Sequence, residues 1–500
     1  MKVDVLGGGP AGLYSAILIK KSNPDAEIRV IERNAPTDTF GFGIVLSDET
    51  LQNLKRADEP SYRNIAQSFA YWDDIHVRYK GHVMTSGGHG FSGLRRLTML
   101  GILQIRAAQL GVEVVYQTEA PSIDDVARHA DLVIAADGIA SAVREKWQPH
   151  FKPSTDVRSN KFCWLGADME LPGFTYAFKE NEHGIWNLHA YMFTKPGDAP
   201  QCTFVFETTD EAFRKSGLAV EDEARTAAYC ETLFADVLNG HKVLTNRSLW
   251  RNFPTIKCET WHHENVVLLG DAAHTAHWSI GSGTKLALED AIALNASIVR
   301  HTTGNAGAQF NDKSTGKSTD MRAALADYEA TRREEADRIQ HSANVSLAWF
   351  ENVRRFWNMH PVQFNFSVMS RSKAITFENM RMRDAASVAE LEDWWNEEVA
   401  RTEQIAPPVS KAASNTADQA ASQLTDSAKK RNLPPMFSPF HLRQMKLRNR
   451  VVVSPMAQYM AKDGMPGDWH LVHYGARAVG GDGHVISVNT SPAPPTARAP

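Results

Sequence analysis

The sequence predicts an α/β fold in which a nucleotide-binding domain is interleaved with a mixed, mainly antiparallel sheet and is followed by helices. Three observations support this prediction. Strand and helix patterns alternate up to about Gly111, short strand-like segments fill the middle of the chain, and helical patterns follow Val266–Leu269. Alternating strands and helices are typical of a parallel sheet covered by helices, whereas consecutive short strands indicate an antiparallel sheet.

A glycine-rich turn defines the first domain. The residues Gly7–Gly12 (GGGPAG) follow the apolar run Val3–Leu6 and precede a helix expected from Leu13 to Lys20. In such a turn the first glycine permits a tight bend, the second lets a pyrophosphate approach, and the third packs helix on strand. A second strand, Ile28–Ile31, ends at Glu32, whose carboxylate can accept hydrogen bonds from ribose hydroxyls. A Rossmann-like domain that binds an adenine dinucleotide is therefore predicted.

Composition and charge exclude other classes. The chain has 500 residues, 43% of them hydrophobic, and a net charge of −4, which argues against nucleic acid as a main partner. The four cysteines are widely spaced, as expected for reduced thiols and not for a disulfide or metal site. A strand that begins at Val3 leaves no room for a signal peptide, and no apolar run approaches about 18 residues. We expect a cytoplasmic protein with no membrane partner.

Two later strands also end in ligand-binding signals. The run Asp131–Ala136 leads into Asp137-Gly138, and Val266–Leu269 leads into Gly270-Asp271. The chain then continues through Gly281-Ser282-Gly283 into a helix expected from Thr284 to Ile292. A carboxylate placed before a helix N-terminus can meet a ligand hydroxyl, while the helix dipole stabilises anionic charge.

The three motifs in this order resemble the single-component FAD-dependent aromatic hydroxylases, the para-hydroxybenzoate hydroxylase-like class. The resemblance implies that the glycine turn and Glu32 hold the ADP half of FAD, that Asp271 reaches the ribityl chain and pyrophosphate, and that Arg96 contacts the phosphates. It also associates Asp137-Gly138 with FAD and NAD(P)H, and it implies that no metal is needed. The predicted cofactor residues are Gly7, Gly9, Pro10, Ala11, Gly12, Glu32, Arg33, Arg96, Asp137, Gly138, Gly270, Asp271, Gly281 and Gly283.

One departure points to a narrower group. Prolines are usual after the Gly-Asp motif, but this chain has His277-Trp278-Ser279-Ile280. With the segments Gly41–Ser47 and Arg371–Asp384, this variant is similar to the salicylyl-CoA 5-hydroxylase and 2-aminobenzoyl-CoA monooxygenase group. The tryptophan hydroxylase of the violacein pathway shares the first two features. We expect His277 or Trp278 to contact the substrate or the flavin and list both as catalytic candidates.

The resemblance also implies the reaction. NAD(P)H, with NADH favoured, would reduce FAD, O₂ would form a C4a-hydroperoxyflavin, and position 5 of an aromatic acyl-CoA would be hydroxylated. A CoA tail needs cations, for which Arg371, Lys373, Arg381 and Arg383 are candidates, although each could simply solvate a helix. A homodimer is possible. Two alternatives stay open: a hydroxylase of a free indole or phenol, and a truncated FAD-binding remnant without turnover.

The expected domain boundaries follow from composition. Residues 1–400 are predicted to form the monooxygenase, with FAD-binding parts near 1–160 and 260–350 and a substrate sheet near 65–95 and 160–255. Residues 405–432 are interpreted as a linker. Residues 433–500 resemble the start of an old-yellow-enzyme barrel, but a (β/α)₈ barrel needs about 250 residues. This incomplete piece is predicted not to be a working reductase, and the chain to be a truncated fusion.

One interpretation concerns the later helices. A helix is expected from Met321 to Ile339, and an ordinary amphipathic face would explain both Tyr328 and Arg332 on it.

Overall fold

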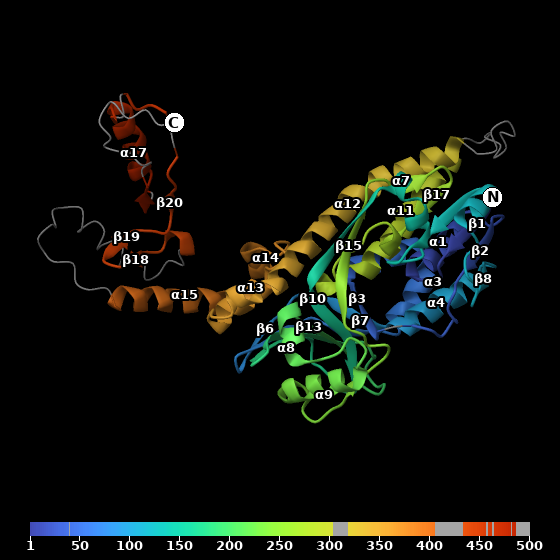
Figure 1. The fold of residues 1–500 in the computed structure, drawn as a ribbon, viewed down its shortest axis with the longest axis horizontal. Helices are drawn as coiled ribbons and strands as arrows, with labels where there is room; N and C mark the ends of the chain where they lie inside the picture. Colours follow the sequence, from blue (N-terminus) through green and yellow to red (C-terminus); the bar gives the residue numbers. More distant parts are fainter. Residues whose placement is uncertain are drawn as a thin grey trace, which may run out of the picture. The chain divides into compact units, whose positions relative to one another are not determined.

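The computed structural model describes residues 1–39, 41–303, 319–405, 434–456, 459–462, 465–481 and 483–486. The chain divides into two compact units, Met1–Ala385 and Ala386–Pro500, and each is described by itself. Figure 1 labels the elements of both units.

A mainly parallel sheet forms the frame of the first unit. Its strand order is β16-β17-β9-β1-β2-β8, and only the hairpin strand β16 runs antiparallel. The strands are β1 (Lys2–Leu6), β2 (Glu27–Ile31), β8 (Glu113–Val115), β9 (Leu132–Ala135), β16 (His262–His263) and β17 (Val266–Leu268). Strand β17 joins this sheet although about 130 residues separate it from β9, so the frame is completed only after the chain has built its second sheet.

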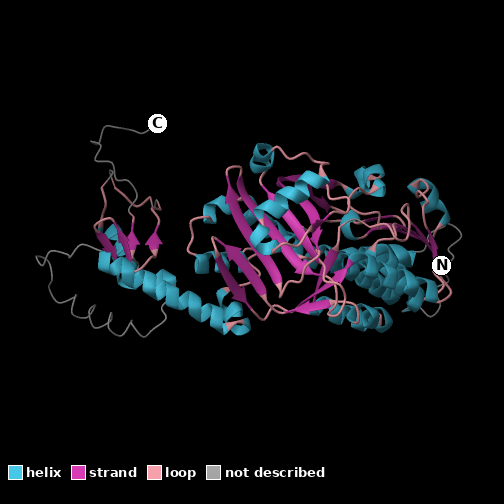
Figure 2. Cartoon of the chain, turned by 90° about the horizontal axis from the view of Figure 1, so that it is seen from below, coloured by secondary structure: helices cyan, strands magenta, loops and turns pink. Residues whose placement is uncertain are grey.

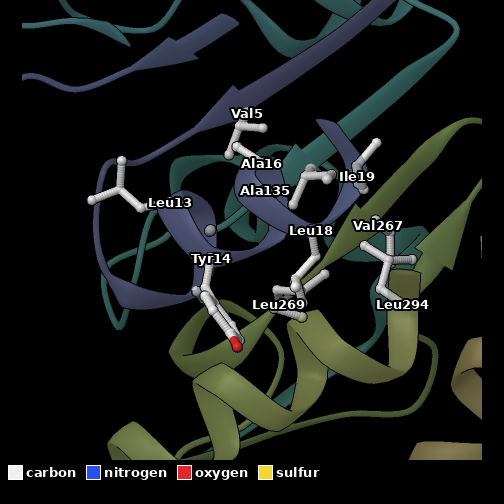
Figure 3. Close-up of a cluster of buried hydrophobic side chains, with 14 of the residues drawn as sticks. Val5, Leu13, Tyr14, Ala16, Leu18, Ile19, Ala135, Val267, Leu269 and Leu294 are labelled. Atoms are coloured by element: carbon white, nitrogen blue, oxygen red, sulfur yellow. The ribbon is translucent and has the colours of Figure 1, made fainter. Parts of the chain in front are cut away.

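The core of this frame lies around α1 (Pro10–Ser22). Every residue from Ala11 to Ile19 is buried, because α1 packs between the parallel sheet and α11 (Gly283–Thr303). Figure 3 shows Val5 and Ala135 of the sheet, Leu18 and Ile19 of α1, and Leu294 of α11 in one apolar cluster. A helix that is apolar on all sides is expected where both of its faces are covered.

The second sheet is larger and mixed. Its strand order is β14-β10-β13-β12-β11-β5-β6, with β15 paired to β10, and β11 runs parallel to β5. Figure 2 shows these strands as the broad magenta sheet. The strands are β5 (Ile75–Tyr79), β6 (His82–Ser86), β10 (Pro153–Ala167), β11 (Phe174–Asn181), β12 (Gly184–Met192), β13 (Cys202–Thr208), β14 (Val243–Leu244) and β15 (Arg251–Cys258).

The two faces of this sheet differ in chemistry. Alternate residues such as Trp186, Leu188 and Phe206 form an apolar core with α8 (Asp210–Ser216), α9 (Glu223–Leu233) and α10 (Ala235–Leu238). The opposite face, which we call the inner face, carries Asn160, Phe162, Trp164, Phe174, Tyr176, Phe178, Asn187, His189, Tyr191, Thr203, Val205 and Glu207. Side chains alternate along a strand, so both sets come from the same four strands.

The predicted substrate sheet needs one correction. Within residues 65–95 only β5 and β6 join the large sheet, because β4 (Ala70–Trp72) and β7 (Phe91–Arg95) pair with β3 (Gly43–Ser47) in a separate three-stranded sheet. Strand patterns in a sequence identify a strand but not its partner, and β7 runs directly into α4 (Arg96–Gln109) of the nucleotide-binding domain.

Helices complete the first unit, and two are longer than expected. The helix α11 continues to Thr303, and α12 spans Thr319–Glu351, since no Gly or Pro interrupts the sequence between Met321 and His360. Residues 304–318, between these two helices, lie outside the described residues. The remaining helices are α2 (Asp48–Ala57), α3 (Glu59–Ala66), α5 (Ile123–His129), α6 (Ala142–Lys146), α7 (Gln148–Phe151), α13 (Pro361–Met369) and α14 (Phe377–Arg383).

The described residues of the second unit form short strands and two α-helices. Its elements are α15 (Ala385–Ile405), β18 (Phe440–Leu442), β19 (Met445–Leu447), β20 (Val452–Val453), α17 (Asp468–Gly480) and β21 (His484–Val485). Strands β20 and β21 pair in parallel on either side of α17, as in one β-α-β unit. The described residues form no closed barrel, and the predicted linker lies outside them. The α/β fold class is confirmed. In the described parts of the chain, no helix is long and apolar enough to cross a bilayer.

Candidate active site

Three strand ends meet at one edge of the parallel sheet. Strand β9 pairs in parallel with β1 on one side and with β17 on the other. The carboxyl ends of these strands carry Gly7, Asp137 and Gly270, so three motifs that are far apart in the sequence become neighbours. Ligands of open α/β sheets bind at this edge.

The glycine turn leaves space at one position and none at two others. Gly7 has φ +107°, and a Cβ built there would lie 2.3 Å from the carbonyl oxygen of Ala136. A Cβ on Gly12 would lie 2.0 Å from the carbonyl oxygen of Gly7, whereas a Cβ on Gly9 would meet nothing within 4 Å. The turn is therefore closed towards the protein at Gly7 and Gly12 and open at Gly9.

The N-terminus of α1 behind this turn is suited to an anion. The helix begins with Pro10, its N-cap Gly9 supplies no side-chain hydrogen bond, and the first turn contains no acidic residue. Its free N–H groups and positive dipole end are left for a ligand phosphate.

Glu32 lies beside the turn and Arg33 points to solvent. The Gly8 amide donates to Oε2 of Glu32 at 2.7 Å, and Asn34 donates to Oε1 through its backbone and its side chain. Arg33 is exposed. The structure thus places Glu32, and not Arg33, against the dinucleotide turn.

Charges of opposite sign meet at the other two strand ends. Asp271 is accessible to water but lies in a dense protein recess, so desolvation raises its pKa, while Arg96 and His274 oppose that shift. Burial lowers the pKa of Arg96, and Asp271 counteracts this effect. Arg144 ties the two strand ends together, because its guanidinium donates to the carbonyl oxygens of Ile139 and Ala272.

A buried ion-pair network holds the Gly270 turn from behind. Asp290 accepts a hydrogen bond from the Gly270 amide at 3.0 Å and one from Nε of Arg332 at 2.8 Å. Arg332 also donates to Glu289 at 3.0 Å, and Nε2 of His274 lies 3.0 Å from Asp290. Burial alone would raise the pKa of Asp290, but His274 and Arg332 lower it. Interpreting Arg332 as part of an ordinary amphipathic face was therefore wrong.

These residues fit an adenine dinucleotide. Oδ1 of Asp137 is buried without a hydrogen-bond partner, and Cβ atoms on Gly138 or Gly283 would meet nothing within 4 Å. An orphaned carboxylate oxygen, open glycines and an uncapped helix N-terminus are the features that ribose hydroxyls and phosphates would complete.

His277 and Trp278 lie between this edge and the inner face of the large sheet. His277 is buried, its Nδ1 accepts from the Ser279 amide at 3.3 Å, and burial holds its pKa well below the usual range. The Trp278 ring lies 4.5 Å from His277 and 4.6 Å from His189 of β12. After the short helix at Trp278–Ile280, Gly281 turns the chain with φ +65° into α11.

The four cations expected to bind a CoA tail differ in their surroundings in the structure. Lys373, Arg381 and Arg383 are exposed. Arg371 instead turns inward and donates to Tyr176 Oη at 2.5 Å and to the Ser279 carbonyl at 2.7 Å. It also donates to Ser346 and to the Val368 carbonyl, so Arg371 is a structural tie and not a free cation.

Cations also line two cavities beside Arg95. One cavity, of about 360 Å³, is lined by Arg95, Lys195 and Gln201 among others, and the other, of about 350 Å³, by Arg95, Asn246 and Arg247 among others. The sequence analysis did not single out these residues.

Two buried ionisable residues were also missed. His189 of β12 and Glu207 of β13 project from the inner face with Nε2 and Oε2 3.3 Å apart. Burial raises the pKa of Glu207 to about 8 and lowers that of His189, so both are neutral near pH 7. The available signal was an ionisable residue within the otherwise largely apolar and aromatic segments Ile185–Tyr191 (His189) and Thr203–Glu207 (Glu207).

Comparison with known proteins identifies the class. The family model described as FAD binding domain matches residues 93–329. A single-residue variant of 2-methyl-3-hydroxypyridine-5-carboxylic acid oxygenase has a similar fold, with a TM-score of 0.55, 20% identity, and coverage of 74% of this chain and 96% of that one. A likeness at this identity shows that the two proteins share a fold.

Two curated relatives narrow the family. Salicyloyl-CoA 5-hydroxylase of a Streptomyces species is 39% identical over 79% of this chain and 74% of its own length. The 3-hydroxy-4-methyl-anthranilyl-[aryl-carrier protein] 5-monooxygenase of Streptosporangium sibiricum is 32% identical over 71% of this chain and 90% of its own length. The chain belongs to the family of FAD-dependent aromatic hydroxylases that includes these proteins, as its motifs predicted.

The glycine turn gives a first prediction. Gly12→Ala should abolish FAD retention and destabilise the fold by about 1–3 kcal/mol, because the new methyl group overlaps the Gly7 carbonyl. Gly101→Ala in α4 is the matched control: its Cβ meets nothing within 4 Å, so a gain of about 0.5–1 kcal/mol is expected. Urea denaturation and bound-flavin absorbance measure both effects. Full FAD retention in Gly12→Ala would contradict the prediction.

The ion-pair network gives a second prediction. Arg332→Leu should cost about 3–5 kcal/mol of unfolding free energy, because it leaves Asp290 buried without its guanidinium partner and Glu289 paired only with Lys285. Arg300 pairs with Asp327 across the same two helices but is half exposed, so Arg300→Leu should cost less than about 1 kcal/mol. Equal losses for the two variants in urea denaturation would refute the structural role of Arg332.

The raised pKa of Glu207 gives a third prediction. Between its ordinary pKa of 4.5 and about 8, Glu207 is protonated in the folded chain but ionised in the unfolded chain. The folded state then binds the extra proton, so unfolding free energy falls as pH rises, by up to about 1.4 kcal/mol per pH unit. Glu207→Gln should remove this part of the slope. Identical pH profiles of stability for both proteins would exclude a raised pKa.

Proposed function

We propose that this enzyme uses NAD(P)H, FAD and O₂ to hydroxylate an aromatic acyl thioester bearing an ortho hydroxyl or amino group, at position 5. Both relatives are named for an aromatic acyl group of this kind attached to CoA or to a carrier protein, and both names specify position 5. An ortho donor activates the ring carbon para to it, which is position 5 in a salicylyl or 2-aminobenzoyl group.

The charge of the inner face supports a thioester over a free acid. The inner-face side chains named above for β10–β13 include no Lys or Arg, and Glu207 is neutral near pH 7. Arg158, further along β10, is paired with Asp156 and Glu351. Arg371 approaches from the helical side with four bonds to protein acceptors. The cations near this face, Arg158 and Arg371, are thus already bonded to protein acceptors. Burying a free aromatic carboxylate there would be costly, whereas a neutral acyl thioester avoids that cost.

Different residues would bind the cofactor and surround the substrate. Bound FAD supplies the redox chemistry, taking electrons from NAD(P)H and activating O₂. The glycine turn, Asp271 and Arg96 would hold it, and the buried aromatic side chains of the inner face would exclude water from the ring. We propose that His277 and Trp278 contact the substrate or the flavin ring. His277 is buried and Trp278 is half-buried, with the two rings 4.5 Å apart, which supports this role.

The nucleotide part of a CoA thioester would require cations near the surface. Arg95, Lys195 and Arg247 around the two cavities are candidates, as are the exposed Lys373, Arg381 and Arg383. We also propose a cytoplasmic location, which the four free, buried cysteines support.

The proposal predicts substrate-stimulated NADH oxidation. Salicylyl-CoA or 2-aminobenzoyl-CoA should raise the oxidation rate of the FAD-loaded enzyme at least about tenfold over salicylate, 2-aminobenzoate or tryptophan. Mass spectrometry should find one added oxygen atom in the acyl group. Stimulation by a free aromatic alone would favour an indole or phenol hydroxylase, and no response to any aromatic would indicate an FAD-binding remnant.

A further inference from the structure

Several buried polar atoms at one place on the inner face have no hydrogen-bond partner. They are Nδ1 and Nε2 of His189, Oε2 of Glu207, Oδ1 of Asn187 and Nε1 of Trp278. The side chains of His189, Glu207 and Asn187 are at most 2% exposed. We call these four residues the polar centre.

Sheet register brings the polar centre together. Asn187 of β12 is paired with Glu207 of β13, and His189 lies two residues further along β12, so all three side chains project from the inner face. Nε2 of His189 lies 3.3 Å from Oε2 of Glu207 without forming a hydrogen bond. The Trp278 ring stands nearly perpendicular to the His189 ring, with centroids 4.6 Å apart.

Some neighbouring polar groups are satisfied, although Nε1 of Trp164 is also without a partner. Oε1 of Glu207 accepts from Asn160 at 2.9 Å, and Tyr176 and Arg371 are bonded to each other. Each buried polar atom left without a partner costs about 1–3 kcal/mol, and such atoms are rare in native proteins. Five such atoms on four side chains that lie side by side indicate a place that another polar group completes.

The chemistry of the polar centre selects that group. Burial keeps both Glu207 and His189 uncharged near pH 7, so each can donate one hydrogen bond and accept another, and Trp278 can only donate. A hydroxyl or amino group both donates and accepts and is uncharged. A carboxylate only accepts, and Arg371, whose charge acts on His189 and Glu207, already donates to four protein acceptors.

We propose that His189, Glu207, Asn187 and Trp278 bind the electron-donating hydroxyl or amino substituent of the aromatic ring. This inference rests on the proposed function and names the part of the substrate that the inner face recognises. Fixing that substituent fixes the rotation of the ring, and hence the carbon atom that faces the flavin.

Ligand binding without turnover tests the proposal. Calorimetry with FAD-loaded protein and no NADH should show salicylyl-CoA and 2-aminobenzoyl-CoA binding at least about tenfold more tightly than benzoyl-CoA or 2-methylbenzoyl-CoA. The methyl analogue matches the hydroxyl in size but forms no hydrogen bond. If it binds as tightly as salicylyl-CoA in the wild-type protein, the polar centre holds only water and the proposal is overturned. This comparison needs no variant.

Substitutions test whether the polar centre causes this difference in affinity. Glu207→Leu and Asn187→Leu should reduce the ratio between salicylyl-CoA and 2-methylbenzoyl-CoA to about one, with the affinity for the methyl analogue retained. Thr208→Val is the matched control, because Thr208 follows Glu207, is equally buried and donates to the Ile185 carbonyl. Flavin content and thermal unfolding show which variants are folded. Folded Glu207 and Asn187 variants that keep the wild-type ratio would overturn the proposal.

A second ligand set separates this inference from the proposed function. If no thioester binds, phenol and toluene, and indole and 1-methylindole, are compared in the same way. The wild-type protein could still bind phenol or indole more tightly than its methyl analogue. If Glu207→Leu removes that difference in affinity, the role of the polar centre is supported although the acyl-thioester function fails. A wild-type protein that discriminates in no pair overturns the proposal, whatever its oxidase activity.

Discussion

Parallel pairing of β9 with β1 on one side and β17 on the other is the constraint on which the whole site depends. It places the glycine turn, Asp137 and Asp271 at one sheet edge although about 260 residues separate the first from the last. The buried bonds of Asp290 to the Gly270 amide and to Arg332 then fix the last strand end against α11 and α12. Without this arrangement, no single ligand could contact all three motifs.

The second sheet supplies what the first lacks. The face that packs against α8, α9 and α10 contributes to an apolar core, while the inner face carries aromatic rings and a few buried polar groups. Trp278 connects the parallel sheet with the second sheet. It follows the β17 strand end at Asp271 in sequence, and its ring packs against His189 of the second sheet. The cofactor edge and the aromatic inner face are thereby brought into contact through one short loop.

The sequence was informative where function depends on local backbone geometry. The position of Gly7–Gly12, Glu32, Asp137 and Asp271 at strand ends could be predicted, because strand, turn and helix lie within a few residues of one another. Their contact with FAD stays a prediction. The roles of Arg332 and Arg371 could not, because each depends on partners that lie far away in the sequence. Glu207 could not be predicted for a related reason. Its burial and its closeness to His189 result from the pairing of β12 with β13, which no pattern within one strand reveals.

A crystal structure of the FAD-loaded protein tests the central claim most directly. The account predicts the pyrophosphate at the N-terminus of α1, ribose hydroxyls at Glu32, and the flavin ring beyond Asp271, facing Trp278 and the inner face. FAD bound away from the shared edge of β1, β9 and β17, or a flavin ring directed away from the second sheet, would contradict it.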